Sequence, residues 1–310
     1  MRSSFQTWRT RRCCYVAIFV TIAFIISAVV VGIAFGLRHK HEKSGAPPPP
    51  SATAPFNPGN RTISPNGTWW KPTPRTTWQI VLNETIEPTG FENVAVYDID
   101  LFNTPSSTID ALHAAGIRVI CYFSAGSYEN WRPDANKFPK SVLGTPLDGW
   151  PGERWLNVSS SDVRTIMTSR IELAYNKSCD GLDPDNIDGY SNDNGLGLTE
   201  EDAVDYVKFL VQQGHSRGMA VGLKNAGEIV PNVTQIVDWE VNEQCVQYDE
   251  CDTFEPFISA DKPVFHIEYP NNTNLVSIQT ICSESPSNFS TLLKHMELDE
   301  WDVACWNVTS

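Results

Sequence analysis

The chain has 310 residues, of which 41% are hydrophobic and 11% aromatic, and its formal net charge is −14. This composition excludes a wholly disordered chain, a collagen and a coiled coil. The acidity excludes a generic nucleic-acid-binding protein, because an acidic surface repels phosphate.

The charge is unevenly distributed along the chain. Residues 1–43 hold seven of the 23 basic side chains and one of the 37 acidic ones, which leaves 16 basic and 36 acidic side chains, a net −20, for the remainder. An acidic body of this kind attracts cations or a polycation. The same acidity would also keep an extracellular protein soluble, so composition alone leaves both interpretations open.

Residues 13–37 form a predicted transmembrane anchor. This stretch contains no charged side chain and is mostly Val, Ile, Phe and Ala. It is longer than the ~20 residues that cross a bilayer as a helix, whereas a signal peptide has an apolar stretch of only ~7–15 residues. Basic residues flank both ends, so the positive-inside rule gives no orientation.

The orientation follows from potential glycosylation sites on the C-terminal side of the anchor. Nine Asn-x-Ser/Thr sequons occur there, at Asn60, Asn66, Asn83, Asn157, Asn176, Asn232, Asn271, Asn288 and Asn307. Such sites are used in lumenal or extracellular segments. We therefore expect a single-pass type II protein of the plasma membrane, with residues 1–12 as its cytosolic tail.

A Pro-rich linker is predicted at residues 38–75, before a catalytic body at 76–310. Residues 44–75 contain nine prolines, and Gly, Asn, Ser and Thr fill much of the rest. This composition packs no core and is typical of an extended stalk.

Short β-branched runs alternate with helical stretches in the body. We predict strands at 78–82, 94–101, 117–124, 180–183, 219–224, 236–241, 263–268 and 301–306. Predicted helices cover 105–115, 162–177, 199–213, with Thr199 as N-cap, and 292–300. Eight such repeats fit an α/β fold of the TIM-like (β/α)₈ barrel type. A doubly wound open sheet is the alternative, but no G-x-G-x-x-G follows the first strand.

Chemistry in such a barrel lies at the carboxyl ends of the strands. Several predicted strand ends carry carboxylates and aromatic rings, which suit a sugar because rings stack on its faces and acids bind its hydroxyl or amine groups. We expect substrate contacts from Asp98, Asp100, Tyr122, Asp188, Lys224, Asn225, Asn242, Glu268 and Trp306.

Two carboxylates on different strands are the minimum for glycoside hydrolysis. The fourth and sixth strands lie two apart, so their ends can face each other. This spacing selects the group Asp183, Asp185 and Asp188 together with Glu243. Acids after a strand also cap helices or brace turns, and the residues alone leave that role open for each of them.

Other chemistry fits the sequence less well. The stretch from Asp183 to Asn194 lacks the Gly and Glu that a calcium loop requires, and the body has no zinc-ligand pair, so we expect neither a metal nor a cofactor. Lys224 could instead form a Schiff base in an aldolase-like barrel, although a lysine paired with neighbouring acids fits so many carboxylates better.

Six cysteines lie in the body, an even number that favours disulfides in an oxidising compartment. Cys245 and Cys251 are six residues apart, so we predict that they close a short loop beside Glu243. We also expect the pairs Cys282–Cys305 and Cys121–Cys179.

Residues 76–310 resemble glycoside hydrolase family 114, the endo-α-1,4-polygalactosaminidases. The similar runs are TWQIVL (77–82), VYDIDLF (96–102), VICYFSAGSYENWRPD (119–134), WPGERWLNV (150–158), DNIDGY (185–190), GLKN (222–225), NEQC (242–245) and KPVFHIEY (262–269). The anchor and stalk resemble those of a cell-surface fungal member.

This resemblance implies an enzyme that cuts internal α-1,4-galactosamine linkages of a partly deacetylated galactosaminogalactan, a polymer of fungal cell wall and biofilm. It implies a retaining mechanism, with Asp185 as nucleophile and Glu243 as acid/base. The free amines of this partner are cationic, which gives the acidic body a function. We expect a monomer without a nucleic-acid partner; a catalytically silent carbohydrate-binding barrel is the alternative.

The retaining mechanism also makes a prediction about ionisation. Asp185 must be ionised to attack the anomeric carbon, whereas Glu243 must hold a proton near neutral pH. A neighbouring anionic Asp185 would raise the pKa of Glu243, and we expect that shift.

Overall fold

The computed structural model describes residues 68–87 and 89–308. The predicted tail at 1–12, the anchor at 13–37 and most of the linker at 38–75 lie outside these ranges. Among the described residues, no helix combines the length and the apolar character that a membrane span needs.

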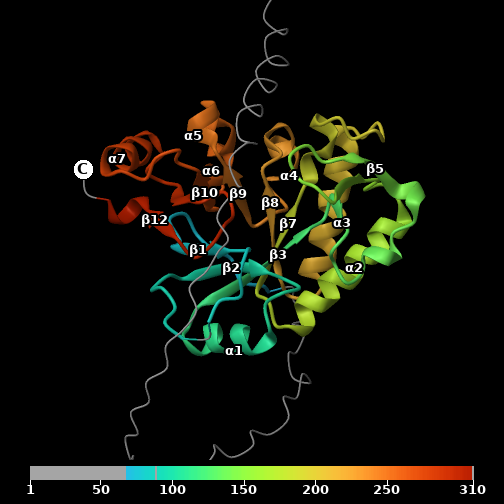
Figure 1. The fold of residues 1–310 in the computed structure, drawn as a ribbon, viewed down its shortest axis with the longest axis horizontal. Coiled ribbons are helices and arrows are strands. Elements are labelled where there is room, and N and C mark those ends of the chain that lie inside the picture. Colours follow the sequence, from blue (N-terminus) through green and yellow to red (C-terminus); the bar gives the residue numbers. More distant parts are fainter. Residues whose placement is uncertain (1–67, 88, 309–310) are drawn as a thin grey trace, which may run out of the picture. The chain divides into compact units, whose positions relative to one another are not determined.

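A nearly closed barrel of parallel strands dominates the described part (Figure 1). Its sheet has the order β1-β2-β3-β7-β8-β9-β10-β11-β12, in which β1 to β11 pair in parallel and β12 runs antiparallel to β11. The bounds are β1 Trp78–Val81, β2 Val96–Asp100, β3 Arg118–Ser124, β7 Gly181–Asp185, β8 Ala220–Lys224, β9 Trp239–Glu243, β10 Val264–Glu268, β11 Ser290–Lys294 and β12 Asp302–Ala304.

Helices connect the strands and cover the outside of the sheet (Figure 1). They are α1 Ser106–Ala114, α2 Ser161–Asn176, α3 Glu200–His215, α4 Val230–Val233, α5 Cys245–Tyr248, α6 Glu255–Ser259 and α7 Leu275–Glu284. The first three confirm the predicted helices. Thr199 caps α3 as predicted, because its hydroxyl accepts from Asp202 N at 3.2 Å while the Asp202 carboxylate accepts from Thr199 N at 3.0 Å.

The segment that links β3 to α2 in the sequence forms a second, antiparallel sheet, which was not predicted. It consists of β4 Ser127–Glu129, β5 Leu143–Pro146 and β6 Glu153–Leu156, in the order β4-β6-β5.

The two ends of the parallel series meet through side-chain hydrogen bonds. Trp78 Nε1 donates to Ser290 O at 2.8 Å, and Ser290 Oγ donates to Thr76 O at 2.7 Å. The predicted (β/α)₈ architecture is therefore present in coarse form, as a nearly closed α/β barrel.

Trp239 fills the barrel interior. A Cβ atom at Gly181 would lie 2.4 Å from its ring, and one at Gly222 would lie 2.1 Å from Trp239 Nε1. Only glycine fits at these two positions, because the large ring of one strand occupies the space of two neighbouring side chains.

The end of the predicted linker packs against the amino-terminal end of the barrel strands. Trp70 contacts Trp239, with ring centroids 5.8 Å apart, and Trp69 stacks on His215 at 3.7 Å. Trp69 Nε1 also donates to Asp238 Oδ1 at 2.8 Å. Both tryptophans are therefore part of the folded body.

The eighth parallel strand is β11, not the predicted strand at 301–306. β11 begins before the segment 292–300 and includes its first three residues. The prediction of a helix at 292–300 is therefore wrong. All five residues of β11 are buried, and Phe265 to Glu268 of β10 pair with Ser290 to Leu293. Pairing with a strand distant in sequence outweighs the local preference for helix. The predicted strand is reduced to β12, which is antiparallel.

The three predicted disulfides are confirmed. Cys121 pairs with Cys179, Cys245 with Cys251, and Cys282 with Cys305.

Candidate active site

Asp185 is the last residue of β7, at the carboxyl end of the barrel. Its Oδ2 atom accepts a hydrogen bond from the Tyr122 hydroxyl at 2.8 Å, and Oδ1 accepts from Asn186 N at 2.7 Å. Asn186 has a left-handed backbone with φ 63°, so the chain changes direction directly after the strand. Tyr122 comes from the adjacent strand β3, so two elements fix this carboxylate.

Glu243 is the last residue of β9. Asn225, which follows β8, bonds it twice: Asn225 Nδ2 donates to Glu243 Oε2 at 3.0 Å, and Glu243 N donates to Asn225 Oδ1 at 2.9 Å. The Tyr269 hydroxyl donates to Glu243 Oε1. The carboxylate is thus oriented by residues from both neighbouring strands.

Lys224 lies between the two carboxylates. It is the last residue of β8, which pairs with β7 on one side and with β9 on the other. Its Nζ atom is 3.5 Å from Asp185 Oδ1 and 3.0 Å from Glu243 Oε2. The lysine side chain is 3% exposed, against 18% for Asp185 and 23% for Glu243, so the carboxylates face the opening and the ammonium lies beneath them.

The charge of Lys224 is stable at this position. Burial favours the neutral amine, but the carboxylates of Asp185, Glu243 and Asp183 outweigh burial and raise the pKa of Lys224 well above its ordinary value. An ammonium group has no free electron pair with which to attack a carbonyl. The Schiff-base alternative is therefore not supported.

The pKa of Glu243 differs from the sequence-based expectation. Burial favours the protonated acid, but the Lys224 ammonium and the hydrogen bonds from Tyr269 and Asn225 outweigh burial, so the pKa is lowered. The expected rise considered only the negative charge of Asp185. The cation between the two acids reverses the direction.

Two further aspartates lie near the pair. Asp98 and Asp183 are fully buried, and their two carboxyl groups interact with each other. Burial and the neighbouring Asp183 raise the pKa of Asp98 well above its ordinary value; burial and Asp185 raise that of Asp183 to about 7, against the effect of Lys224. Asp188 is partly exposed, and burial and Asp185 raise its pKa to about 6.

Four of the residues expected to bind substrate form no hydrogen bond or ion pair with Asp185, Lys224 or Glu243 in the described part of the chain. Asp100 is buried and forms an ion pair with Arg132 at 2.7 Å. Glu268 is buried and accepts from Val246 N at 2.8 Å. Asn242 precedes Glu243 on the same strand, so its buried side chain points to the opposite face of the sheet.

Trp306 is the fourth of these residues. It lies in the short helix η6 Cys305–Asn307, after the antiparallel β12 and not at the end of a parallel strand. The misplaced eighth strand is the reason for this difference. Asp98 likewise has no exposed surface with which to meet a substrate. The structure does gather Tyr122, Lys224 and Asn225 around Asp185 and Glu243.

Tyr269 was not among the residues expected to bind substrate, although it directly follows β10. Tyr269 lies at the end of the same predicted strand as Glu268, but only Glu268 was expected to contact substrate. Its hydroxyl bonds Glu243, and burial together with Glu243 raises its pKa well above the ordinary tyrosine value.

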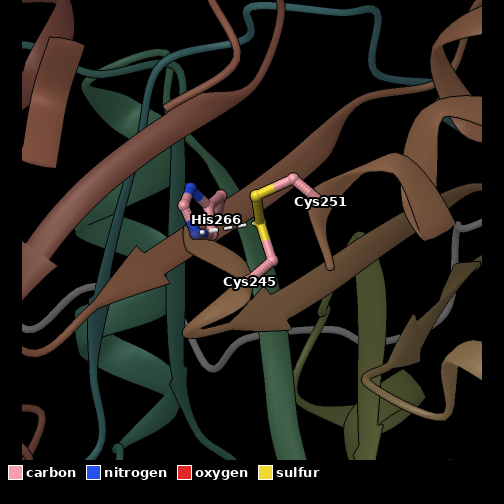
Figure 2. Close-up of side chains that lie close together, drawn as sticks. All are labelled: Cys245, Cys251 and His266. Atoms are coloured by element: carbon pink, nitrogen blue, oxygen red, sulfur yellow. Dashed lines mark hydrogen bonds between the residues drawn. A yellow bond between two sulfur atoms is a disulfide. The ribbon is translucent and has the colours of Figure 1, made fainter. Parts of the chain in front are cut away.

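Cys245, Cys251 and His266 form a cluster that begins two residues after Glu243 in the sequence (Figure 2). The ligand atoms of Cys245, Cys251 and His266 lie within 4.8 Å of one another, which suggests a metal site by spacing. The two sulfurs form a disulfide, however, and His266 Nε2 lies 2.9 Å from Glu268 Oε1. Metal binding requires thiolates, so the oxidised cluster does not fit a metal.

Asp185 can supply an ionised oxygen and Glu243 a proton donor to the same glycosidic bond. Both carboxylates approach the same nitrogen, Lys224 Nζ. The distance between Asp185 Oδ1 and Glu243 Oε2 therefore cannot exceed the sum of their distances to this nitrogen, 3.5 Å and 3.0 Å. Carboxyl groups lie ~5–5.5 Å apart in retaining glycosidases and ~6.5–9.5 Å apart in inverting ones. The close approach of these two oxygens favours the retaining arrangement over the inverting one.

Known proteins similar to this chain agree with the geometry. The model of glycoside-hydrolase family GH114 matches residues 60–310. The crystal structure of Ega3 from Aspergillus fumigatus, in complex with galactosamine, has 49% sequence identity and a TM-score of 0.74, and the match covers 77% of this chain and 98% of that one. No curated protein matches the sequence.

A more distant similarity concerns the fold alone. The glycoside hydrolase domain of PelA from Pseudomonas aeruginosa has 11% identity and a TM-score of 0.63, over 74% of this chain and 98% of that one.

Proposed function

We propose, from the premise that the chain belongs to glycoside-hydrolase family GH114, that it cuts internal α-1,4-galactosamine linkages of a partly deacetylated galactosaminogalactan with retention of configuration. That the chain is a glycoside hydrolase follows from the family. The observation that carries the retaining mechanism is the placement of Asp185, Lys224 and Glu243 at the carboxyl ends of three adjacent strands.

Two observations support the substrate. Ega3, which is 49% identical, was crystallised with galactosamine. The chain beyond residue 43 carries a net −20, and a polymer with free amines is cationic near neutral pH. The acidic surface would concentrate such a polymer at the protein.

In the first step, the ionised Asp185 attacks the anomeric carbon while Glu243 protonates the leaving oxygen. A bond forms between Asp185 and the sugar, and the glycosidic bond breaks. Tyr122 holds the attacking carboxylate through its 2.8 Å hydrogen bond, and Tyr269 and Asn225 hold the acid. Because the pKa of Glu243 is lowered, only a minor fraction of the free protein carries this proton at neutral pH.

In the second step, Glu243 acts as a base. Asp185 is then a neutral ester. Of the two catalytic residues, only Glu243 still places a carboxylate charge beside Lys224. A lowered pKa suits this step, because Glu243 must be ionised to take a proton from the attacking water. Water attacks the anomeric carbon, the ester breaks, and Asp185 leaves as a carboxylate.

Incubation of the full-length protein with deacetylated α-1,4-galactosamine oligomers tests this function. Mass spectrometry should detect shorter oligomers of several lengths from the earliest times, as internal cleavage requires. The Asp185→Asn variant serves as the inactive control. An absence of shorter products with the wild-type protein would contradict the proposal.

We also propose that residues 13–37 hold the protein in the plasma membrane, as a monomer with its catalytic body outside the cell. The sequence supports this arrangement through the apolar stretch and the nine sequons that follow it. Protease treatment of intact cells should remove the body, and enzymatic deglycosylation should lower its apparent mass. A body protected from protease in intact cells would contradict the proposed orientation.

A further inference from the structure

Two tryptophans are exposed on the loops that follow β3. Trp131 is 54% and Trp150 55% exposed, and in the described ranges 68–87 and 89–308 no other tryptophan is more than half exposed. An exposed indole ring leaves a large apolar surface in water, which is unfavourable unless a ligand covers it.

Trp131 and Trp150 lie at one corner of the small antiparallel sheet. Asn130 N donates to Gly152 O at 3.1 Å, and a Cβ atom at Gly152 would lie 3.0 Å from the Trp131 ring. Trp150 begins the turn that ends at β6, in which Glu153 N donates to Trp150 O at 3.2 Å. The two tryptophans therefore lie on segments that contact each other directly.

The backbone around Trp131 is held by buried charges. The next residue, Arg132, is buried, and its guanidinium group lies 2.8 Å from Glu129 Oε1 and 2.7 Å from Asp100 Oδ2. The exposure of Trp131 is thus not the result of a loosely packed loop. A ring fixed in position loses little conformational freedom when it binds a ligand.

The segment that leads into this corner is hydrogen-bonded to Asp185 of the catalytic pair. Ala125 N and Gly126 N donate to Asp185 O at 2.9 and 3.0 Å, so the chain enters β4 beside the proposed nucleophile. Arg132, next to Trp131, contacts Asp100 at the carboxyl end of β2, so the two tryptophans lie on the side of the barrel that carries the catalytic pair.

The chemistry of the platform fits a hexosamine chain. In an α-1,4-linked galactosamine ring, the face opposite the axial oxygen at C4 carries the C–H groups of C3 and C5 beside the axial oxygen at C1, and this C–H patch stacks on an indole. The ammonium group at C2 adds a cation–π attraction to the same ring. Asp148, two residues before Trp150, is also exposed and carries the opposite charge.

We infer that Trp131 and Trp150 form an aromatic platform that binds galactosamine rings of the same polymer chain, outside the position of the cleaved bond. The identity of the ligand that we assign to this platform depends on the proposed function. It would hold a long polymer across the site and so favour long chains over short oligomers.

Kinetics on two substrates test the platform. Trp131→Ala and Trp150→Ala should each lower kcat/KM on long deacetylated polymer about tenfold, and lower it less than twofold on the shortest oligomer that the wild type cuts. Trp131→Phe should retain most of the activity because it keeps a ring. Val276→Ser, which removes a 72% exposed side chain from α7, is the control and should change neither rate.

Unchanged rates on long polymer in both alanine variants would overturn the platform, as would equal losses on long and short substrates. Thermal unfolding of each variant shows whether it is folded.

Binding separates the platform from the proposed function. In the Asp185→Asn background, Trp131→Ala should weaken the Kd for long deacetylated polymer about tenfold by calorimetry. An unchanged Kd, or no binding of the polymer at all, overturns the platform. Binding that depends on Trp131, together with a wild-type protein that cuts nothing, would support the platform and overturn the proposed function.

Discussion

Lys224 Nζ lies 3.0 Å from Glu243 Oε2, so a buried cation contacts the carboxyl group that must donate a proton. The same ammonium lies 3.5 Å from Asp185 Oδ1. This contact determines the resting charge of the pair: Lys224 keeps both acids close together while it lowers the pKa of Glu243.

The first prediction concerns Lys224 and the pH dependence of the reaction. Because Glu243 must be protonated while its pKa is lowered, kcat/KM of the wild type should rise as the pH falls from about 7 toward 5. Lys224→Met removes the cation, so the pKa of Glu243 rises and the alkaline limb of the profile moves to higher pH. We expect kcat to fall about 10²-fold, because the charge that orients both acids is lost.

Lys262→Met is the control for this experiment. Lys262 is a partly buried lysine that bonds Thr234 O and Val237 O before the amino-terminal end of β9, whereas the pair lies at the carboxyl ends of the strands. Its pH profile should match that of the wild type. An alkaline limb at the same pH in Lys224→Met and in the wild type would contradict the assigned role of Lys224.

The second prediction concerns stability and pH. Asp183 and Glu129 are buried, and burial raises both pKa values to about 7, from ordinary values of 3.8 and 4.5. Between these values the folded protein binds protons that the unfolded chain does not bind, so their stabilising contribution is lost as the pH rises through about 7. Tm should therefore be lower at pH 8 than at pH 5, and Asp183→Asn should reduce the difference. A Tm that rises over this interval would argue against these ionisation states.

Much of the site could be predicted from the sequence because parallel strands bring their ends together. Polar residues after buried runs located Asp185, Lys224 and Glu243 at strand ends, and the structure gathers them. The choice of Asp185 over Asp183 depended on family resemblance. The alternation of side chains explains the difference: Asp183 lies two residues deeper on the same face, where no water reaches it.

Two features could not be predicted from local patterns. The strand β11 depends on pairing with β10, and the segment around Leu292 to Glu300 favours helix when it is considered alone. The lowered pKa of Glu243 depends on a lysine from the intervening strand, whose distance to each carboxylate is a property of the folded barrel. Tertiary contacts decide both.

The third prediction concerns the aromatic end of the linker. Trp70 packs on Trp239, which fills the barrel interior, so Trp70→Ala in the full-length protein should lower the free energy of unfolding by about 2 kcal/mol. In a body of this size, that change lowers Tm by about 4–8 °C. Lys71→Ala, at the adjacent exposed position, should change Tm by less than about 2 °C. Equal Tm values for the Trp70 variant and the wild type would show that the linker end does not stabilise the barrel.

The fourth prediction concerns the disulfide beside Glu243. Cys245 begins α5 two residues after Glu243, and its bond to Cys251 fixes the start of that loop. Replacement of both cysteines by Ser should lower kcat about tenfold, because a small displacement of the acid misaligns the proton transfer. The pair Cys282 and Cys305, replaced in the same way, should lower Tm but leave kcat within twofold. If both double variants lose activity equally, the loop has no special role in positioning Glu243.

The fifth prediction concerns the identity of the nucleophile. Asp185→Asn should lower kcat at least 10⁴-fold while the Kd for polymer changes little, because the amide keeps the shape of the carboxyl group but cannot attack. Asp188→Asn should lower kcat far less. Asp188 accepts a hydrogen bond from the Asn192 side chain at 3.2 Å, and in the described part of the chain it forms no ion pair with Lys224.

The most direct measurement is the trapping of the covalent intermediate. A 5-fluoro-α-galactosaminyl fluoride slows both chemical steps, so a retaining enzyme accumulates the glycosyl ester, which can be located by peptide mass spectrometry. We predict a single adduct, on Asp185, that forms in the wild type and not in Asp185→Asn. An adduct on Asp183 or Asp188, or turnover of the natural polymer with inverted configuration, would contradict the assignment.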